Sequence, residues 1–126
     1  MSLTTKLFLV LGALNAVLAV ILGAFGAHAL KARVSAEMLA VYQTGVQYHF
    51  NHALGLVLVG LAIAQLPESA FLKWSGGLML VGIVLFSGSL YGLSLSELRW
   101  LGAVTPFGGA AFIAAWVVFV VGVIEA

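Results

Sequence analysis

The chain has 126 residues, of which 63% are hydrophobic and only 7% are charged, and its formal net charge is +1. Soluble domains carry roughly a quarter charged residues, so this chain has too few charges to cover a soluble globule. A nearly neutral chain also lacks the basic surface that binds nucleic acid. The absence of cysteine excludes disulfides and thiolate metal sites. With a mean hydropathy of +1.21, the composition predicts an integral membrane protein whose first partners are membrane lipids.

Charged residues divide the chain into four apolar runs. These runs cover residues 7–30, 39–66, 74–95 and 100–124. Each run reaches the roughly 20 residues that an α-helix needs to cross about 30 Å of hydrocarbon. A transmembrane barrel would show alternating segments of about ten residues, and the sequence has none. We therefore predict one all-α domain over residues 1–126, a polytopic membrane protein folded as an antiparallel four-transmembrane-helix bundle.

The first run has one rival interpretation. Its apolar stretch ends in Ala27-His28-Ala29, which resembles the small-residue cleavage site of a signal peptide. The stretch is longer than a usual signal core, which favours a membrane-spanning helix.

Small residues also recur four apart along the first run at Ala19, Gly23 and Ala27, and such stripes let helix backbones approach closely in lipid. We expect these stripes to serve packing within the bundle, with an oligomer interface as the alternative.

The second and fourth runs carry helix-start signals. Ser35 can cap the N-terminus of the second helix, and Glu37 then lies in the first turn, where the helix dipole favours an acid. This helix is therefore expected to begin before its apolar run. Pro106, which follows Thr105, fits the first turn of the fourth helix, where its missing N–H does no harm.

Corresponding runs share a faint pattern. Thr44-Gly45 opens the second span and Thr105-Pro106 opens the fourth, while His28 ends the first and Tyr91 ends the third. Two tandem helical hairpins in the same orientation would give this pattern. The identity between the halves is too low for more, so a tandem hairpin repeat stays an open alternative.

Polar side chains are concentrated at the head of the second run, between Gln43 and His52. At helical spacing they form two neighbouring stripes, Gln43, Gln47 and Asn51, and Thr44, Tyr48 and His52. Around the helix axis, His49 lies about 60° from His52. Chain reversal is expected to bring the ends of the first and third spans to the same depth in the membrane. The candidate polar cluster comprises His28, Gln43, Thr44, Gln47, Tyr48, His49, Asn51, His52, Ser87, Ser89, Tyr91 and Thr105.

Three interpretations of the histidines compete. In the first, each histidine bonds across the bundle and fixes helix register. In the second, the cluster binds a solute, lipid or ion, because histidine changes charge near neutral pH. In the third, His28, His49 and His52 supply three imidazoles to one metal ion. No carboxylate lies at that depth, which disfavours the metal, and no nucleophile stands beside an obvious base, which disfavours an enzyme. We predict no catalytic residue and no cofactor.

Four motifs in the same order resemble a known family. They are Gly23-Ala24-Phe25-Gly26-Ala27-His28-Ala29-Leu30, Tyr42-Gln43-Thr44-Gly45-Val46-Gln47-Tyr48-His49 with His52, Leu85-Phe86-Ser87-Gly88-Ser89-Leu90-Tyr91, and Thr105-Pro106-Phe107-Gly108-Gly109. The chain is similar over nearly its whole length to the YgdD-type proteins, small bacterial inner-membrane proteins catalogued as a domain of unknown function. The resemblance implies a four-helix, multi-pass protein of the bacterial inner membrane, and it implies no activity, substrate or cofactor.

These observations favour a structural or accessory role. The apolar bulk, the small-residue stripes and the lack of catalytic groups suit a small membrane protein that forms a homo-oligomer or joins a larger membrane complex. The alternative is binding or transport of a small solute, lipid or ion through the polar cluster. Neither interpretation calls for a nucleic acid.

Overall fold

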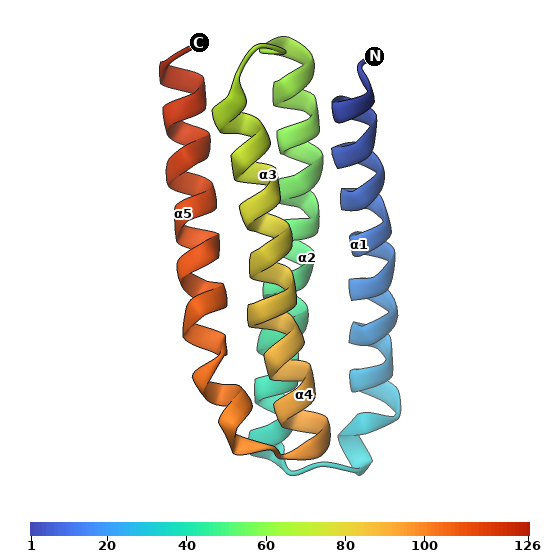
Figure 1. Cartoon of the computed structure of the whole chain (residues 1–126). Coiled ribbons are helices and arrows are strands. Elements are labelled where there is room, and N and C mark those ends of the chain that lie inside the picture. Colours follow the sequence, from blue (N-terminus) through green and yellow to red (C-terminus); the bar gives the residue numbers. More distant parts are fainter.

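The protein is a bundle of four long helical segments connected by short turns (Figure 1). The computed structural model describes the whole chain, Met1–Ala126. The segments are α1 (Leu3–His28), α2 (Ala36–Gln65), α3 (Ala70–Gly82) continued through Ile83–Ser87 into α4 (Gly88–Ser96), and α5 (Thr105–Ile124). All four are long and apolar enough to cross a membrane. The predicted class, an all-α polytopic membrane protein, is confirmed.

Short polar signals fix where the helices begin. Ser35 accepts a hydrogen bond from the backbone N–H of Met38 at 3.2 Å and caps α2, as predicted. Ser2 and Ser69 cap α1 and α3 in the same way. Pro106 lies in the first turn of α5, also as predicted. The polar residues just outside the apolar runs therefore set the helix starts.

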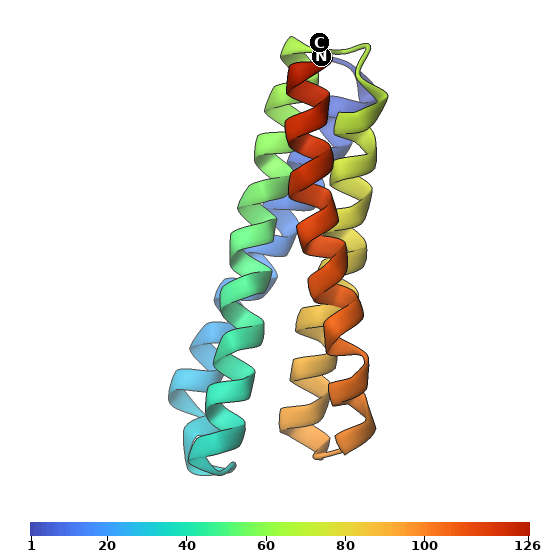
Figure 2. The same cartoon turned by 90° about the vertical axis from the view of Figure 1, so that its left-hand side faces the viewer.

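Helix α1 lies antiparallel along α2. The two backbones approach closely at Gly12, where an added Cβ would meet the Ala53 carbonyl and Val57. At Gly26 the Tyr42 ring occupies the space that a Cβ would need. These contacts set the register of the hairpin. Figure 2 shows that the α1–α2 and α4–α5 pairs diverge toward the end opposite the termini.

The third segment contains a π-helical turn at Ile83–Ser87. Here α5 comes so close that a Cβ on Gly108 would meet the backbone of Leu85 and Phe86. A π-turn inserts one extra residue, which rotates every following side chain by about 100° relative to a regular α-helix. The turn therefore decides which side chains of α4 face α2 and α5.

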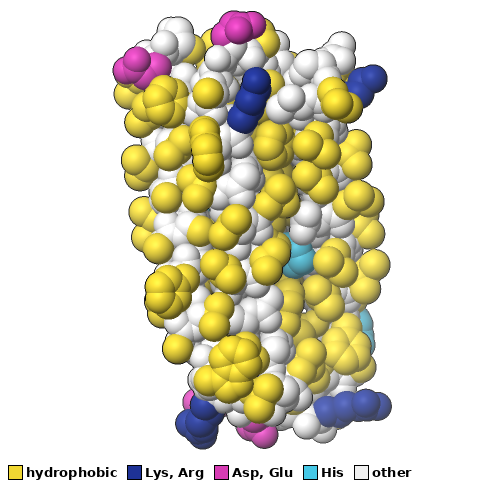
Figure 3. Space-filling view, in the orientation of Figure 1, with side chains coloured by type: hydrophobic (Ala, Val, Ile, Leu, Met, Phe, Trp, Pro, Cys, Tyr) yellow, Lys and Arg dark blue, Asp and Glu magenta, His cyan; other side chains and the backbone are white.

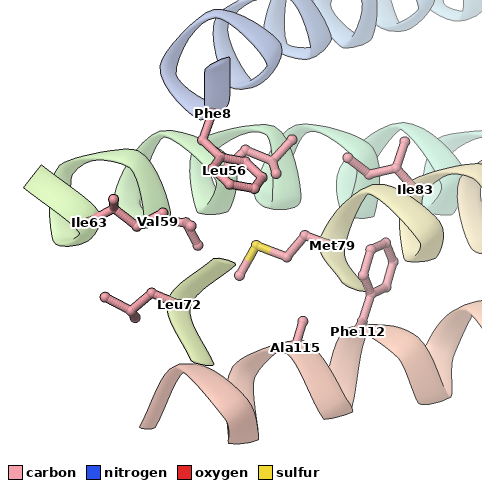
Figure 4. Close-up of a cluster of buried hydrophobic side chains, with 9 residues drawn as sticks. All are labelled: Phe8, Leu56, Val59, Ile63, Leu72, Met79, Ile83, Phe112 and Ala115. Carbon is pink, nitrogen blue, oxygen red and sulfur yellow. The ribbon is translucent and has the colours of Figure 1, made fainter. Parts of the chain in front are cut away.

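The apolar core occupies the half of the bundle that holds both termini. All four segments contribute to it (Figure 4), and its members are Phe8, Leu56, Val59, Ile63, Leu72, Met79, Ile83, Phe112 and Ala115. On the face seen in Figure 3, hydrophobic side chains cover the middle of the molecule, and the Lys, Arg, Asp and Glu side chains lie at its two ends. This distribution matches a protein whose middle is immersed in hydrocarbon.

Candidate functional site

His49 links three helices from the buried side of α2. Its Nδ1 lies 2.8 Å from the hydroxyl of Tyr91 on α4, and its Nε2 lies 2.9 Å from Oδ1 of Asn15 on α1. The amide nitrogen of Asn15 donates to the Leu11 carbonyl at 2.8 Å, which leaves Oδ1 as the acceptor toward the imidazole. The His49 Nε2–H therefore donates to Asn15. In the neutral imidazole Nδ1 then accepts from the Tyr91 hydroxyl.

His52 takes the opposite tautomer one turn further along α2. Its Nδ1–H donates to the Tyr48 carbonyl at 2.7 Å, and its Nε2 accepts from the indole N–H of Trp116 on α5 at 3.0 Å. The ring stacks on Phe112, with centroids 3.5 Å apart and planes at 10°. Because an indole nitrogen can only donate, Nε2 of His52 carries no proton in this arrangement. His52 is likewise a neutral imidazole that holds α2 against α5.

Hydroxyl groups make the remaining links between helices. The Ser87 hydroxyl donates to the Gly45 carbonyl at 2.8 Å, and Ser89 on α4 pairs with Thr105 on α5 at 2.6 Å. The Tyr42 hydroxyl donates to the Leu22 carbonyl of α1. No buried side-chain nitrogen or oxygen is left without a hydrogen-bond partner. The buried polar groups thus form a closed set of contacts between helices.

Some predicted members of the cluster lie together and others do not. The structure joins His49 to Tyr91 and Ser89 to Thr105, and it bonds Ser87 to the Gly45 carbonyl of α2. Thr44 bonds only within its own helix, to the Ala40 carbonyl at 3.0 Å. Tyr48 is partly exposed, and its ring packs on Phe86 and Phe112. The predicted cluster therefore contains side chains that make hydrogen bonds between helices and others that make none.

His28 lies apart from the other histidines. It is the exposed last residue of α1, and the hairpin register places it near Val41 rather than beside His49. Our expectation of a shared depth overlooked how far α2 continues before its histidines, which stand at the middle of the helix. No three His, Cys, Asp or Glu side chains are placed to hold a metal ion, so the three-histidine site does not form.

The side of α2 that faces away from His49 carries three exposed amide side chains, those of Gln43, Gln47 and Asn51. None of them makes a side-chain hydrogen bond within the chain, in contrast to the neighbouring histidines. Gln47 and Asn51 line a shallow groove of about 350 Å³ between α1 and α2, whose other wall includes Val20 and Gly23. We call Gln43, Gln47 and Asn51 the amide stripe.

Several residues that hold the buried contacts were not predicted from the sequence. Asn15 is the one amide inside the first apolar run, and a lone polar residue in a membrane span is a signal that could have found it. Trp116 lies inside the fourth apolar run, although its indole N–H needs an acceptor when it faces the bundle. Ser75, whose hydroxyl donates to the Ala115 carbonyl at 2.7 Å, carried no signal among small residues.

Four apolar helices joined by a buried polar network define a polytopic α-helical membrane protein. Among known protein families, one described as "Protein of unknown function (DUF423)" matches residues 22–109 of this chain. The chain belongs to this family.

Curated relatives match over nearly their full length. The chain is 51% identical over 120 residues to the UPF0382 membrane protein YwdK of Bacillus subtilis (strain 168), covering 95% of this chain and 98% of the relative. It is 46% identical over 117 residues to the UPF0382 membrane protein SSP2132 of Staphylococcus saprophyticus, covering 93% and 96%. These names state a membrane location and no enzymatic activity. No solved structure matches the chain.

Proposed function

We propose that this protein is a non-catalytic accessory protein of the bacterial inner membrane, of the YgdD type, that acts by associating with other membrane proteins. One observation carries the proposal: every buried polar side-chain atom is engaged inside the chain, while the amide stripe on α2 is not. The buried groups are used to hold the bundle together. The amides are the polar groups that remain for contacts outside it.

The state of the histidines supports a structural role for them. General acid–base chemistry or ligand binding needs a ring nitrogen that can reach the substrate or ligand. In His49 and His52 both nitrogens already have partners on neighbouring groups. A ligand would have to displace a hydrogen bond between helices, at a cost of about 0.5–1.5 kcal/mol for each bond and more for a group left unpartnered.

The amide stripe supports association. Polar side chains on a membrane-spanning helix are expensive in lipid and stabilise contacts between helices when they find partners. The inner-membrane part of the proposal is supported by the all-helical architecture, because bacterial outer-membrane spans are β-barrels.

The proposal is tested in bacterial membranes with the tagged chain expressed at its native level. After mild solubilisation, blue-native electrophoresis should show the protein in a particle larger than one 13.1 kDa chain in its micelle. Asn51→Leu should shift the protein to the monomer position. The matched change Ile113→Ala, on the exposed side of α5, should not. A wild-type protein that runs only as the monomer would refute the proposal.

Binding of a small solute or lipid is a second candidate, favoured by the groove that Gln47 and Asn51 line beside α1. In that case a ligand should raise the thermal unfolding midpoint of the wild type and should lose this effect in Gln47→Leu. Blank screens of the wild type with phospholipids and small polar solutes would remove the basis for this candidate.

A further inference from the structure

The amide stripe lies deep in the membrane-spanning part of α2. The helix has 30 residues, Ala36–Gln65, so it is about 45 Å long and exceeds the hydrocarbon thickness of about 30 Å. With the helix centred in the bilayer, Asn51 lies within about 1 Å of the midplane and Gln47 lies about 5 Å from it. Neither amide then reaches the headgroups or bulk water.

An amide at this depth requires a partner. Burying an amide without a hydrogen bond costs about 1–3 kcal/mol on protein scales and more against hydrocarbon. The chain offers none, because Gln47 and Asn51 are exposed and make no side-chain hydrogen bond within it. The isolated bundle is therefore incomplete at this face.

The same face continues along α2 with a regular spacing. Its exposed residues are Gln47, Asn51, Leu54, Leu58, Leu61 and Gln65, alternately four and three apart. The same four-three spacing is found in the seam of a two-stranded coiled coil, in which leucines pack as knobs into holes. A single asparagine in such a seam favours two parallel strands in one register, because its amide is satisfied only by the asparagine of the other strand.

We propose that this face, the seam from Gln47 to Gln65 on α2, binds a second copy of this chain in the same membrane orientation, about a two-fold axis along the membrane normal. The inference rests on the proposed function and names the partner. In this dimer Asn51 faces Asn51 of the second copy, and Gln47 faces Gln47. Each amide carries both a donor and an acceptor, so two identical amides at equal depth bond reciprocally.

Symmetry favours a second copy over an unrelated protein. A different partner would have to place a donor and an acceptor at both depths, whereas a parallel copy does so automatically. The wall of the groove beside the seam is built partly of Ala19, Gly23 and Ala24 on α1. Small residues there leave room for the second helix to approach closely enough for the amides to meet.

The chain has no cysteine, so single cysteines report contacts without background. Leu54→Cys, which keeps the Asn51 amide, is oxidised with copper phenanthroline in native membranes and should cross-link into a species of twice the 13.1 kDa chain mass. Leu58→Cys, one turn along the seam, should also cross-link. The control is Ile113→Cys, which is 69% exposed on α5 beside the residue that stacks on His52, and it should stay monomeric. Equal cross-linking at residues 54 and 113, or none at 54, overturns the proposal.

A second measurement separates this inference from the proposed function. In lipid nanodiscs of phosphatidylethanolamine and phosphatidylglycerol, Asn51→Leu should weaken dimerisation by about tenfold while the chain stays folded. If residue 54 does not cross-link but Asn51→Leu still shrinks the native particle, another protein covers the face, and only the second-copy inference fails. If neither the cross-link nor the particle size responds, both proposals fail.

Discussion

Two sets of polar side chains lie along the same half of α2, and one set is buried in the bundle while the other is exposed. His49 and His52 are buried, 2% and 5% exposed, and each is bonded on both ring nitrogens. Gln47 and Asn51 stand one or two residues away, are exposed, and have no partner in the chain. At about 100° per residue, such a step along a helix is enough to turn a side chain from the bundle to the lipid.

The difference shows two uses of polar residues in a membrane helix: stabilising the fold and contacting another molecule. A buried polar group that is fully satisfied within the fold stabilises that fold and is unavailable for other contacts. An exposed amide adds nothing to the monomer and becomes favourable only when another molecule completes its hydrogen bonds. Substitutions on the two faces should therefore have separable effects, and the following predictions test that separation.

The largest effect is expected for His49→Leu. The substitution leaves Oδ1 of Asn15 and the Tyr91 hydroxyl, both half-buried, without partners, which should lower the free energy of unfolding by about 2–4 kcal/mol. Reversible unfolding in mixed detergent–SDS micelles measures this loss. His28→Leu is the matched control and should change the free energy by less than about 0.5 kcal/mol, because His28 is exposed at a helix end. Equal losses in the two variants would contradict a structural His49.

Tyr91→Phe should cost about 1–2 kcal/mol, because only the donor to His49 Nδ1 is removed. Combined with His49→Leu in a double-mutant cycle, the two losses should be non-additive by about 1 kcal/mol. Strict additivity would mean that the hydroxyl and the imidazole do not interact.

Trp116→Phe should cost about 1 kcal/mol through loss of the indole donor to His52. Trp100→Phe is the control, because Trp100 lies exposed near the end of the bundle. The same unfolding assay compares them, and a larger loss for Trp100→Phe would contradict the assignment of His52 Nε2 as an acceptor.

The smallest effect is expected from metal removal. All four ring nitrogens of His49 and His52 have partners, so treatment with EDTA should leave the thermal unfolding midpoint unchanged. A chelator-sensitive midpoint together with stoichiometric metal by elemental analysis would contradict the hydrogen-bond network.

The helices could be predicted because the bilayer fixes their length. Apolar runs long enough to span it, broken by charged residues, leave few alternatives to four helices, and Ser35 marked the start of α2. The π-helical turn at Ile83–Ser87 could not be predicted, because its residues are ordinary for an apolar helix. It lies where α5 approaches the third segment closely at Gly108.

The polar cluster was only partly predictable for a different reason. Helical spacing gave the stripes on α2, but the polar arc covers more than half of the helix, so spacing alone could not decide which stripe faces inward. The deciding partners lie on other helices: Asn15 on α1 and Trp116 on α5, both inside apolar runs. Tertiary contacts, not local pattern, separate the histidines from the amides.

The most direct test compares His49→Leu and Asn51→Leu in one experiment, with the unfolding free energy measured on monomers in detergent and the dimer fraction measured in lipid nanodiscs. We predict that His49→Leu destabilises the monomer by about 2–4 kcal/mol. Asn51→Leu should leave the monomer within about 0.5 kcal/mol of the wild type while it dissociates the dimer. If Asn51→Leu destabilises the monomer as much as His49→Leu does, and the dimer fraction does not change, the division of α2 into a folding face and an assembly face is wrong.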